Sequence, residues 1–258
     1  MLVEHTLFGD VDKVQVAIER LRTFEPPEGY YLAFSGGKDS ITIYRLAEMA
    51  GVKFDAHFNL TSVDPPEVVR FVREFYPDVK RHSPPMTMWR LILKHKCPPL
   101  RQRRYCCEEL KERGGDGQFI LTGVRWAESV RRKATRKMVE TCYKGRSKRY
   151  LHPIIDWTDD NVWDFIRSEH IPYCSLYDEG FDRIGYILCP MQAKGNVQRD
   201  IDRWPRYADK YIHTFDELIA LRLSEGKRVM QNTGQEVFDW WIQRRSRPIS
   251  DEQIRLFD

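Results

Sequence analysis

Residues 35–40 have the composition of a phosphate-binding loop. Ser35-Gly36-Gly37-Lys38-Asp39-Ser40 follows an apolar, aromatic run at 30–34, and a helical pattern begins directly behind it. Two successive glycines let the backbone approach a ligand and turn its N–H groups inward, and a helix start adds positive potential. Asp39 suits a helix cap or a metal ion. The spacing differs from the Walker A loop, whose first glycine lies further from its Gly-Lys pair. An ordinary glycine turn is the alternative.

Cysteine is the second residue type whose placement points to chemistry. The chain has six cysteines, at 97, 106, 107, 142, 174 and 189. The first ten residues contain no long apolar run, so we expect neither a secretory signal nor a disulfide framework. The cysteines are therefore either buried small side chains or metal and redox ligands.

Positive charge is concentrated in residues 101–149. This segment holds fifteen lysines and arginines against six acidic residues, whereas the whole chain has a net charge of +4. Such a local excess indicates a polyanionic ligand: nucleotide phosphates, sulfate or nucleic acid. A solvated basic face is the alternative.

The elements that must position these residues alternate between strand and helix patterns. We expect strands at 30–34, 53–60, 79–82 and 118–122, and helices at 10–24, 41–49, 66–75 and 86–94. A hairpin is expected over 136–143 and 149–155, a helix after a Thr158 cap, and three helical segments beyond Asn196. With 41% hydrophobic residues, this order predicts an α/β protein with a parallel sheet. Ligands in such sheets bind at the carboxyl ends of strands, where residues 35–40 lie.

The expected organisation has three parts. Residues 1–27 form an N-terminal helix, residues 28–156 a nucleotide-binding α/β domain, and residues 157–258 a Cys-bearing loop followed by a helical region. The chain has no run of roughly 20 apolar residues that could span a membrane. We therefore expect no membrane partner and a cytoplasmic location.

Four stretches together resemble the phosphoadenosine phosphosulfate (PAPS) reductase family, a branch of the PP-loop adenine nucleotide alpha hydrolases. The resemblance covers roughly residues 25–190, and its stretches are Ser35–Ser40, Arg104–Lys111, Thr122–Ser129 with Arg131 and Arg132, and His152–Trp163. It implies a Rossmann-like parallel sheet of the PP-loop type with a helical C-terminal extension.

The resemblance also implies the site residues. The phosphate-binding set is Ser35, Gly36, Gly37, Lys38, Asp39, Ser40, Gly123, Arg125, Arg131 and Arg132, and the catalytic set is Lys38, Asp39, Cys106 and Cys107. The planar fork of Arg125 suits an oxyanion, with a surface arginine as the alternative. Asp39 and Asp156 are candidates for Mg²⁺, with helix capping as the alternative. Trp157 and Trp163 are expected to brace the core rather than to stack on adenine.

Two departures from the family's reductases bear on the reaction. The assimilatory enzymes typically have an altered loop, whereas the intact loop here looks more like relatives that cleave ATP between its α- and β-phosphates. Thioredoxin-dependent reductases use a C-terminal cysteine, and no cysteine follows Cys189. Both departures favour an ATP-pyrophosphatase-type activation for sulfur transfer. Reduction of PAPS, or of adenosine phosphosulfate (APS), to sulfite is one alternative. A nucleotide-binding subunit that acts on nucleic acid with a partner is another.

The resemblance leaves the cysteine site open. An iron–sulfur cluster would use Cys106, Cys107 and Cys189, but residue 186, where a Cys-x-x-Cys partner would stand, is tyrosine. Four cysteines would then require Cys97 or Cys142, and a three-cysteine cluster, zinc and free thiols are the alternatives. The expected cofactors are ATP or PAPS/APS, Mg²⁺ and this cluster. The expected partners are an adenine nucleotide, a sulfur donor or reductant protein, and a nucleic acid or partner subunit.

Overall fold

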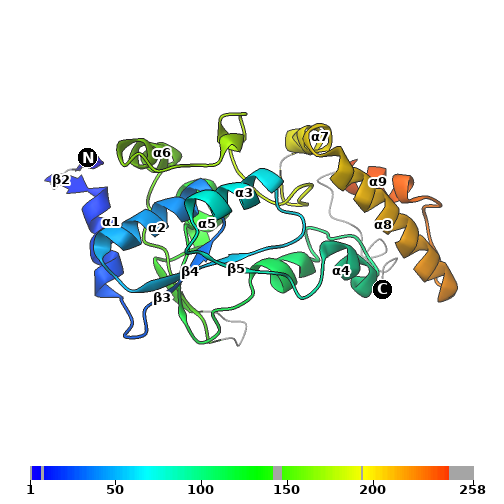
Figure 1. Cartoon of the computed structure of the whole chain (residues 1–258), viewed down its shortest axis with the longest axis horizontal. Coiled ribbons are helices and arrows are strands. Elements are labelled where there is room, and N and C mark those ends of the chain that lie inside the picture. The colour runs from blue at the N-terminus through cyan, green and yellow to red at the C-terminus, as the bar shows by residue number, and fades with distance from the viewer. Residues whose placement is uncertain (1, 7–8, 142–146, 193, 244–258) are drawn as a thin grey trace. The chain divides into compact units, whose positions relative to one another are not determined.

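The computed structural model describes residues 2–6, 9–141, 147–192 and 194–243 (Figure 1). The chain forms two compact units that alternate along the sequence. The first is drawn from residues 1–59, 66–82 and 114–184, and the second from residues 60–65, 83–113 and 185–258. The division at residues 27 and 156 remains a proposal. No helix in the described part of the chain is long and apolar enough to cross a membrane.

A six-stranded sheet forms the centre of the first unit. Its order is β5-β4-β3-β6-β8-β7, and neighbours are parallel from β5 to β8 while β7 pairs antiparallel at the edge. The strands are β3 (Tyr30–Phe34), β4 (Phe54–Asn59), β5 (Lys80–His82), β6 (Phe119–Leu121), β7 (Val139–Thr141) and β8 (Arg149–Leu151). Strands β3 and β6 are almost wholly buried, as expected for parallel strands covered on both faces. The predicted α/β fold with a parallel sheet is confirmed.

Five helices in the described part of the first unit surround the sheet. They are α1 (Lys13–Thr23), α2 (Lys38–Ala50), α3 (Pro66–Phe75), α5 (Val130–Thr135) and α6 (Asp159–Ser168). Two of them, α2 and α6, begin at the phosphate loop. Helix α2 follows β3 through the glycine loop and packs against β3, α1 and α6. It ends at Gly51, whose φ of 68° is the left-handed conformation that glycine favours. The packing of α6 on α2 brings the start of α6 to the glycine loop.

The expected helix over 10–24 begins later than predicted. Gly9–Asp12 forms a strand, β2, that pairs antiparallel with β1 (Val3–Thr6), and the helix starts at Lys13. The Asp12 carboxylate accepts a hydrogen bond from the Val14 amide at 2.9 Å. Asp12 is therefore the cap of α1, because its side chain, not that of Asp10, reaches the amides of the first turn.

The second unit is mainly helical. It contains α4 (Met88–His95), α7 (Lys194–Arg203), α8 (Pro205–Ser224) and α9 (Gly234–Gln243), and α8 packs against the other three. Tyr211 meets the rings of Trp89 and Trp241 at centroid distances of 4.8 and 4.7 Å. The buried Trp241 donates from its ring nitrogen to the carbonyl of Pro99 at 2.8 Å. Three helices beyond the loop at 171–191 agree with the expected C-terminal helical extension.

Candidate functional site

The loop between β3 and α2 has a backbone shape that requires glycine. Gly36 has a φ of 71°, and a Cβ there would lie 2.9 Å from valine methyl groups of α3. Gly37 caps α2 without a side chain. The Ser40 hydroxyl donates to the Gly37 carbonyl at 2.8 Å and accepts from the Ser35 amide at 3.2 Å. The serines thus fix the loop at the positive end of a helix.

Lys38 is held at this loop by residues far along the chain. Its side chain is only 9% exposed, and its Nζ lies 3.2 Å from Asp159 Oδ1. The same nitrogen donates to the carbonyl of Asp182 at 2.9 Å. The backbone N–H of Lys38 donates to the Tyr177 hydroxyl at 2.8 Å. The lysine charge is therefore fixed in direction, towards α6 and the loop that follows it.

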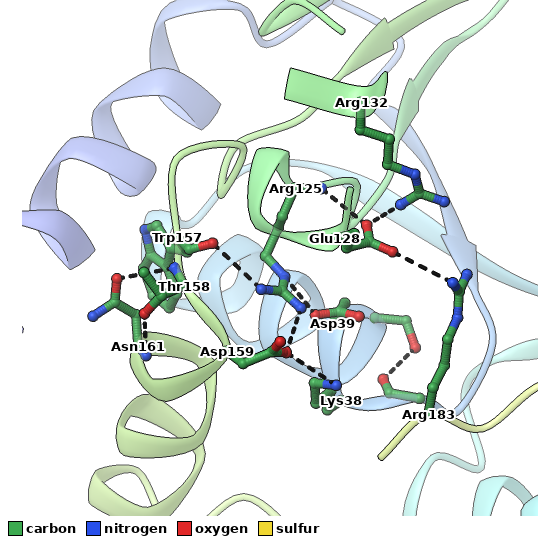
Figure 2. Close-up of polar contacts among 12 residues, drawn as sticks. Lys38, Asp39, Arg125, Glu128, Arg132, Trp157, Thr158, Asp159, Asn161 and Arg183 are labelled. Atoms are coloured by element: carbon green, nitrogen blue, oxygen red, sulfur yellow. Dashed lines mark hydrogen bonds and ion pairs between the residues drawn. The ribbon is translucent and has the colours of Figure 1, made fainter. Parts of the chain in front are cut away.

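Arg125 joins two carboxylates beside this lysine (Figure 2). Its side chain is 1% exposed; Nε donates to Asp39 Oδ1 and Nη2 to Asp159 Oδ1, both at 2.8 Å. Its Nη1 donates to the carbonyl of Trp157 at 3.3 Å. The sequence suggested that this fork faces a ligand oxyanion, and in the structure protein carboxylates meet it. A direct role of Arg125 in binding phosphate remains a prediction.

Gly123 permits the close approach of the β6 end to the loop. A Cβ at this position would lie 2.6 Å from the Cβ of Asp39 and 2.9 Å from its carbonyl oxygen. Contacts this short are not tolerated between side chain and backbone. Gly123 is therefore needed for packing at the site, whether or not its amide binds a ligand.

The two carboxylates differ in their electrostatics. Burial raises the pKa of Asp39 above its ordinary value, although the charges of Arg125 and Lys38 oppose the shift. Burial also acts on Asp159, but hydrogen bonds and charge from Arg125 and Lys38 outweigh it and lower the pKa of that carboxyl. Asp159 is therefore the more firmly ionised of the two.

A second group of cations lies around Glu128 (Figure 2). Arg132 hydrogen-bonds Glu128, and Arg183 Nη1 lies 3.8 Å from Glu128 Oε2. The Arg183 side chain is 68% exposed, so its charge is accessible. Glu128 also contributes to the raised pKa of Asp39, so this group adjoins the loop. Arg131, predicted alongside Arg132, is exposed on α5.

Asp156 and the two tryptophans have structural roles. Asp156, a candidate for Mg²⁺, forms a two-pronged ion pair with Arg20, with bonds of 2.7 and 2.9 Å. Trp157 is fully buried against Phe165 with ring centroids 5.5 Å apart. Trp163 meets Tyr177 edge-on at 5.0 Å. Trp157 packs in the core as expected, whereas Trp163 is half-buried, and Asp156 links α1 to the segment before α6.

The paired cysteines belong to the second unit, where Arg104 contacts one of the two thiols. Cys107 begins a π-helical turn, Cys107–Lys111, and accepts a hydrogen bond from Arg104 Nη2 at 3.3 Å. The hydrogen bond from Cys106, with further help from Arg104, lowers the pKa of Cys107 to about 6, while the pKa of Cys106 itself is raised. The lowered pKa favours the thiolate form of Cys107 over that of Cys106, and the thiolate is the nucleophilic form of cysteine.

The remaining cysteines do not complete a metal site among the described residues. Cys189 interacts electrostatically with Cys106, and the Tyr186 hydroxyl beside them is buried without a hydrogen-bond partner. Cys97 is fully buried in the second unit, Cys174 belongs to the first, and Cys142 lies outside the described residues. In the described ranges no three His, Cys, Asp or Glu side chains are arranged to hold a metal ion. The cluster and Mg²⁺ therefore stay predictions, and no chemical step is derived through either.

Several residues at the site were not predicted from the sequence. Tyr177, the Asp182 carbonyl and Arg183 come from an irregular loop with no motif, so no local signal marks them. Asp159 lies in the stretch His152–Trp163 that carries the family resemblance, but no role at the phosphate loop was predicted for it. Its contacts with Lys38 and Arg125 depend on the packing of α6 on α2.

The fold and the glycine loop define an α/β protein of the PP-loop type. The chain matches the phosphoadenosine phosphosulfate reductase domain over residues 29–192, and it belongs to that family. An uncharacterized protein of Methanocaldococcus jannaschii is 28% identical over 203 residues, which is 72% of this chain and 41% of the relative. Adenosine 5'-phosphosulfate reductase of Oceanobacillus iheyensis is 26% identical, over 66% of this chain and 72% of the relative.

A solved structure gives the same fold. Phosphoadenylyl-sulfate reductase from Candida auris, in a phosphate complex, aligns with a TM-score of 0.50 and 20% identity, over 66% of this chain and 87% of that one. The chain spans less than half the length of the archaeal relatives that it matches, at 41% and 46%.

Proposed function

We propose that the chain binds ATP through the loop Ser35–Ser40 and cleaves it between the α- and β-phosphates to activate a substrate for sulfur transfer. The observation that carries this proposal is the intact loop at the start of α2, with the buried Lys38 held beside it. Departing pyrophosphate needs fixed positive charge, which loop amides, the helix start and an ammonium group supply. Sulfonucleotides whose phosphates are already activated do not require such a loop.

The proposed roles follow the placement of the side chains. Lys38 and the loop residues hold the β- and γ-phosphates, with Asp39 beside them and Gly123 allowing the close approach. Arg132 and Arg183 are suited to the anionic end of the nucleotide, because they flank Glu128 and Arg183 is largely exposed. Arg131, exposed on α5, is assigned to the same anionic end. Arg125 orients Asp39 and contributes positive charge to the anionic end together with Arg131 and Arg132.

The test is the product pattern from ATP. Purified protein is incubated with magnesium, ATP labelled at the α-phosphate and candidate thiolation acceptors, and AMP and pyrophosphate are separated from ADP and phosphate. We expect AMP and pyrophosphate, abolished by Lys38→Ala and retained by Lys53→Ala, which removes an exposed lysine of the same unit. ADP as the main product, or no turnover with any acceptor, would contradict the pyrophosphatase assignment.

A second candidate is reduction of a sulfonucleotide to sulfite. The contact of Arg104 with the Cys107 thiol, whose pKa is lowered, favours it, as do the APS reductases among the relatives. This reaction requires a reductant, and sulfite released from APS or PAPS by wild type but not by Cys107→Ser would establish it. Nucleic-acid binding that weakens with salt and survives Lys38→Ala would instead indicate the third role, as a subunit of a nucleic-acid enzyme.

A further inference from the structure

Asp159 places one carboxylate oxygen against the two most buried cations of the loop site. Its Oδ1 lies 3.2 Å from Lys38 Nζ and 2.8 Å from Arg125 Nη2 (Figure 2). The lysine and arginine side chains are 9% and 1% exposed, whereas the Asp159 side chain is 59% exposed. Two fixed cations that meet on one oxygen of a largely solvated anion form the arrangement expected for a bound phosphate oxygen.

The carboxylate can leave without any movement of the backbone. The start of α6 is fixed by a capping box, in which Thr158 and Asn161 exchange hydrogen bonds of 3.1 Å. Lys13 Nζ also donates to Asn161 Oδ1 at 3.1 Å. A rotation of the Asp159 side chain into water would remove one of the two oxygens that face Lys38 Nζ and would leave the other, the carbonyl of Asp182, in place.

Arg125 keeps two of its three partners when Asp159 departs. Its Nε keeps Asp39 and its Nη1 keeps the carbonyl of Trp157, so only Nη2 loses its partner. The charge of Asp39 also stays beside the buried guanidinium. Two hydrogen-bond donors, Lys38 Nζ and Arg125 Nη2, thus become available at the position that Asp159 Oδ1 occupied.

Helix stabilisation does not account for this contact. Asp159 and Asp160 both lie in the first turn of α6, where either carboxylate interacts favourably with the helix dipole. The Asp160 side chain is also exposed, and it supplies the same charge to the start of the helix. The two cations of the phosphate site, Lys38 and Arg125, therefore explain where the Asp159 carboxylate lies.

We propose that Asp159 is an internal stand-in for phosphate: it occupies Lys38 and Arg125 in the nucleotide-free protein and is displaced when a phosphate group binds. The residue thus limits the affinity of the loop for pyrophosphate and keeps two buried cations neutralised between turnovers. This inference rests on the proposed function, because it requires phosphate to bind at the loop.

The test is a titration with inorganic pyrophosphate, without divalent metal, monitored by calorimetry. Asp159→Asn keeps the shape of the side chain and removes the competing charge. We expect it to bind pyrophosphate about five- to tenfold more tightly than wild type, the scale of a partly solvated ion pair. Asp160→Asn removes the same charge one residue away, and we expect a change below about twofold because exposed charges are screened. Thermal unfolding verifies that both variants are folded.

The outcomes distinguish a failure of the Asp159 proposal from a failure of the phosphate site itself. Tighter binding by Asp159→Asn alone supports the stand-in. Binding to wild type that is unchanged or weakened in Asp159→Asn overturns it, as does an equal gain in Asp160→Asn, which would reflect general charge. If wild type and Asp159→Asn both fail to bind, the phosphate site is wrong and the inference falls with it.

Discussion

Lys38 and Asp39 are consecutive residues of opposite charge that serve different sides of the same site. Successive side chains on a helix point about 100° apart, so the lysine faces α6 and the aspartate faces the end of β6. Arg125 spans the two directions, since it bonds Asp39 and Asp159 with different nitrogens. The residue types of this loop were predictable from the sequence because they are adjacent. The contacts that Lys38 and Asp39 make with Asp159 and Arg125 were not predictable, because these residues lie 86 or more positions further along the chain.

Gly123→Ala tests the close approach at the residue scale. The new methyl group would lie 2.6 Å from Asp39 Cβ, so the loop or the end of β6 must shift. We expect a loss of about 1–3 kcal/mol in the free energy of unfolding, as for other overpacked positions, and weaker phosphate binding.

Urea unfolding followed by circular dichroism measures this change. Gly185→Ala is the control, since nothing lies within 4 Å of a Cβ added there. Equal stability of Gly123→Ala and wild type would show that the site tolerates the methyl group and that the packing argument is wrong.

At the scale of elements, the site is formed where two helices begin and one strand ends at the same edge of the sheet. Helix α2 begins there, β6 ends there, and α6 begins there with its cap at Thr158. The sequence predicted these elements within a few residues, because their periodicity and caps are local signals. It placed the start of α1 too early, since a second aspartate was available to cap the helix. It did not predict that α6 packs on α2, because that contact depends on the fold as a whole.

Thr158→Ala tests how firmly the start of α6 is held. The Thr158 hydroxyl accepts from the Asn161 amide at 3.1 Å, and its loss leaves that amide without its cap. We expect the free energy of unfolding to fall by about 1 kcal/mol. Thr158→Ser should retain most of the stability, because it keeps the hydroxyl.

Thr135→Ala is the matched control, since this exposed threonine ends a helix and its hydroxyl donates to a carbonyl of its own turn. Equal losses in Thr158→Ala and Thr135→Ala would mean that the capping box does not stabilise α6.

At the scale of the whole molecule, the basic segment is divided between the two units. Residues 101–113 belong to the second unit and residues 114–149 to the first. Several of these charges are neutralised locally: Arg136 pairs with Glu140, and the buried Lys148 with Asp116. The charge count predicted an anion site, but it did not predict this division, because the chain passes between the units more than once. Composition suggests boundaries at single positions along the chain, so it cannot predict units that are each built from three separate ranges.

Stability should depend on pH through His152. This side chain is 2% exposed, and burial lowers its pKa below the ordinary value of 6.5, against the opposing charge of Glu140. The unfolded chain therefore binds more protons than the folded one below pH 6.5, so stability is lost as the pH falls through that range. We expect a loss of up to about 3 kcal/mol between neutral pH and pH 4 from this group.

The measurement is urea unfolding at a series of pH values. His152→Gln should flatten the acid side of the profile relative to wild type. Parallel profiles for His152→Gln and wild type would contradict the assignment.

Equilibrium binding tests most directly whether Ser35–Ser40 binds the phosphates of an adenine nucleotide. Wild type, Lys38→Ala and Lys53→Ala are titrated with α,β-methylene-ATP and magnesium, so that binding is measured without cleavage. We predict saturable binding to wild type and Lys53→Ala, and an affinity at least about 30-fold weaker for Lys38→Ala, as expected for the loss of a charged hydrogen-bond donor. Equal affinity of folded Lys38→Ala and wild type, or no binding to either, would contradict the account.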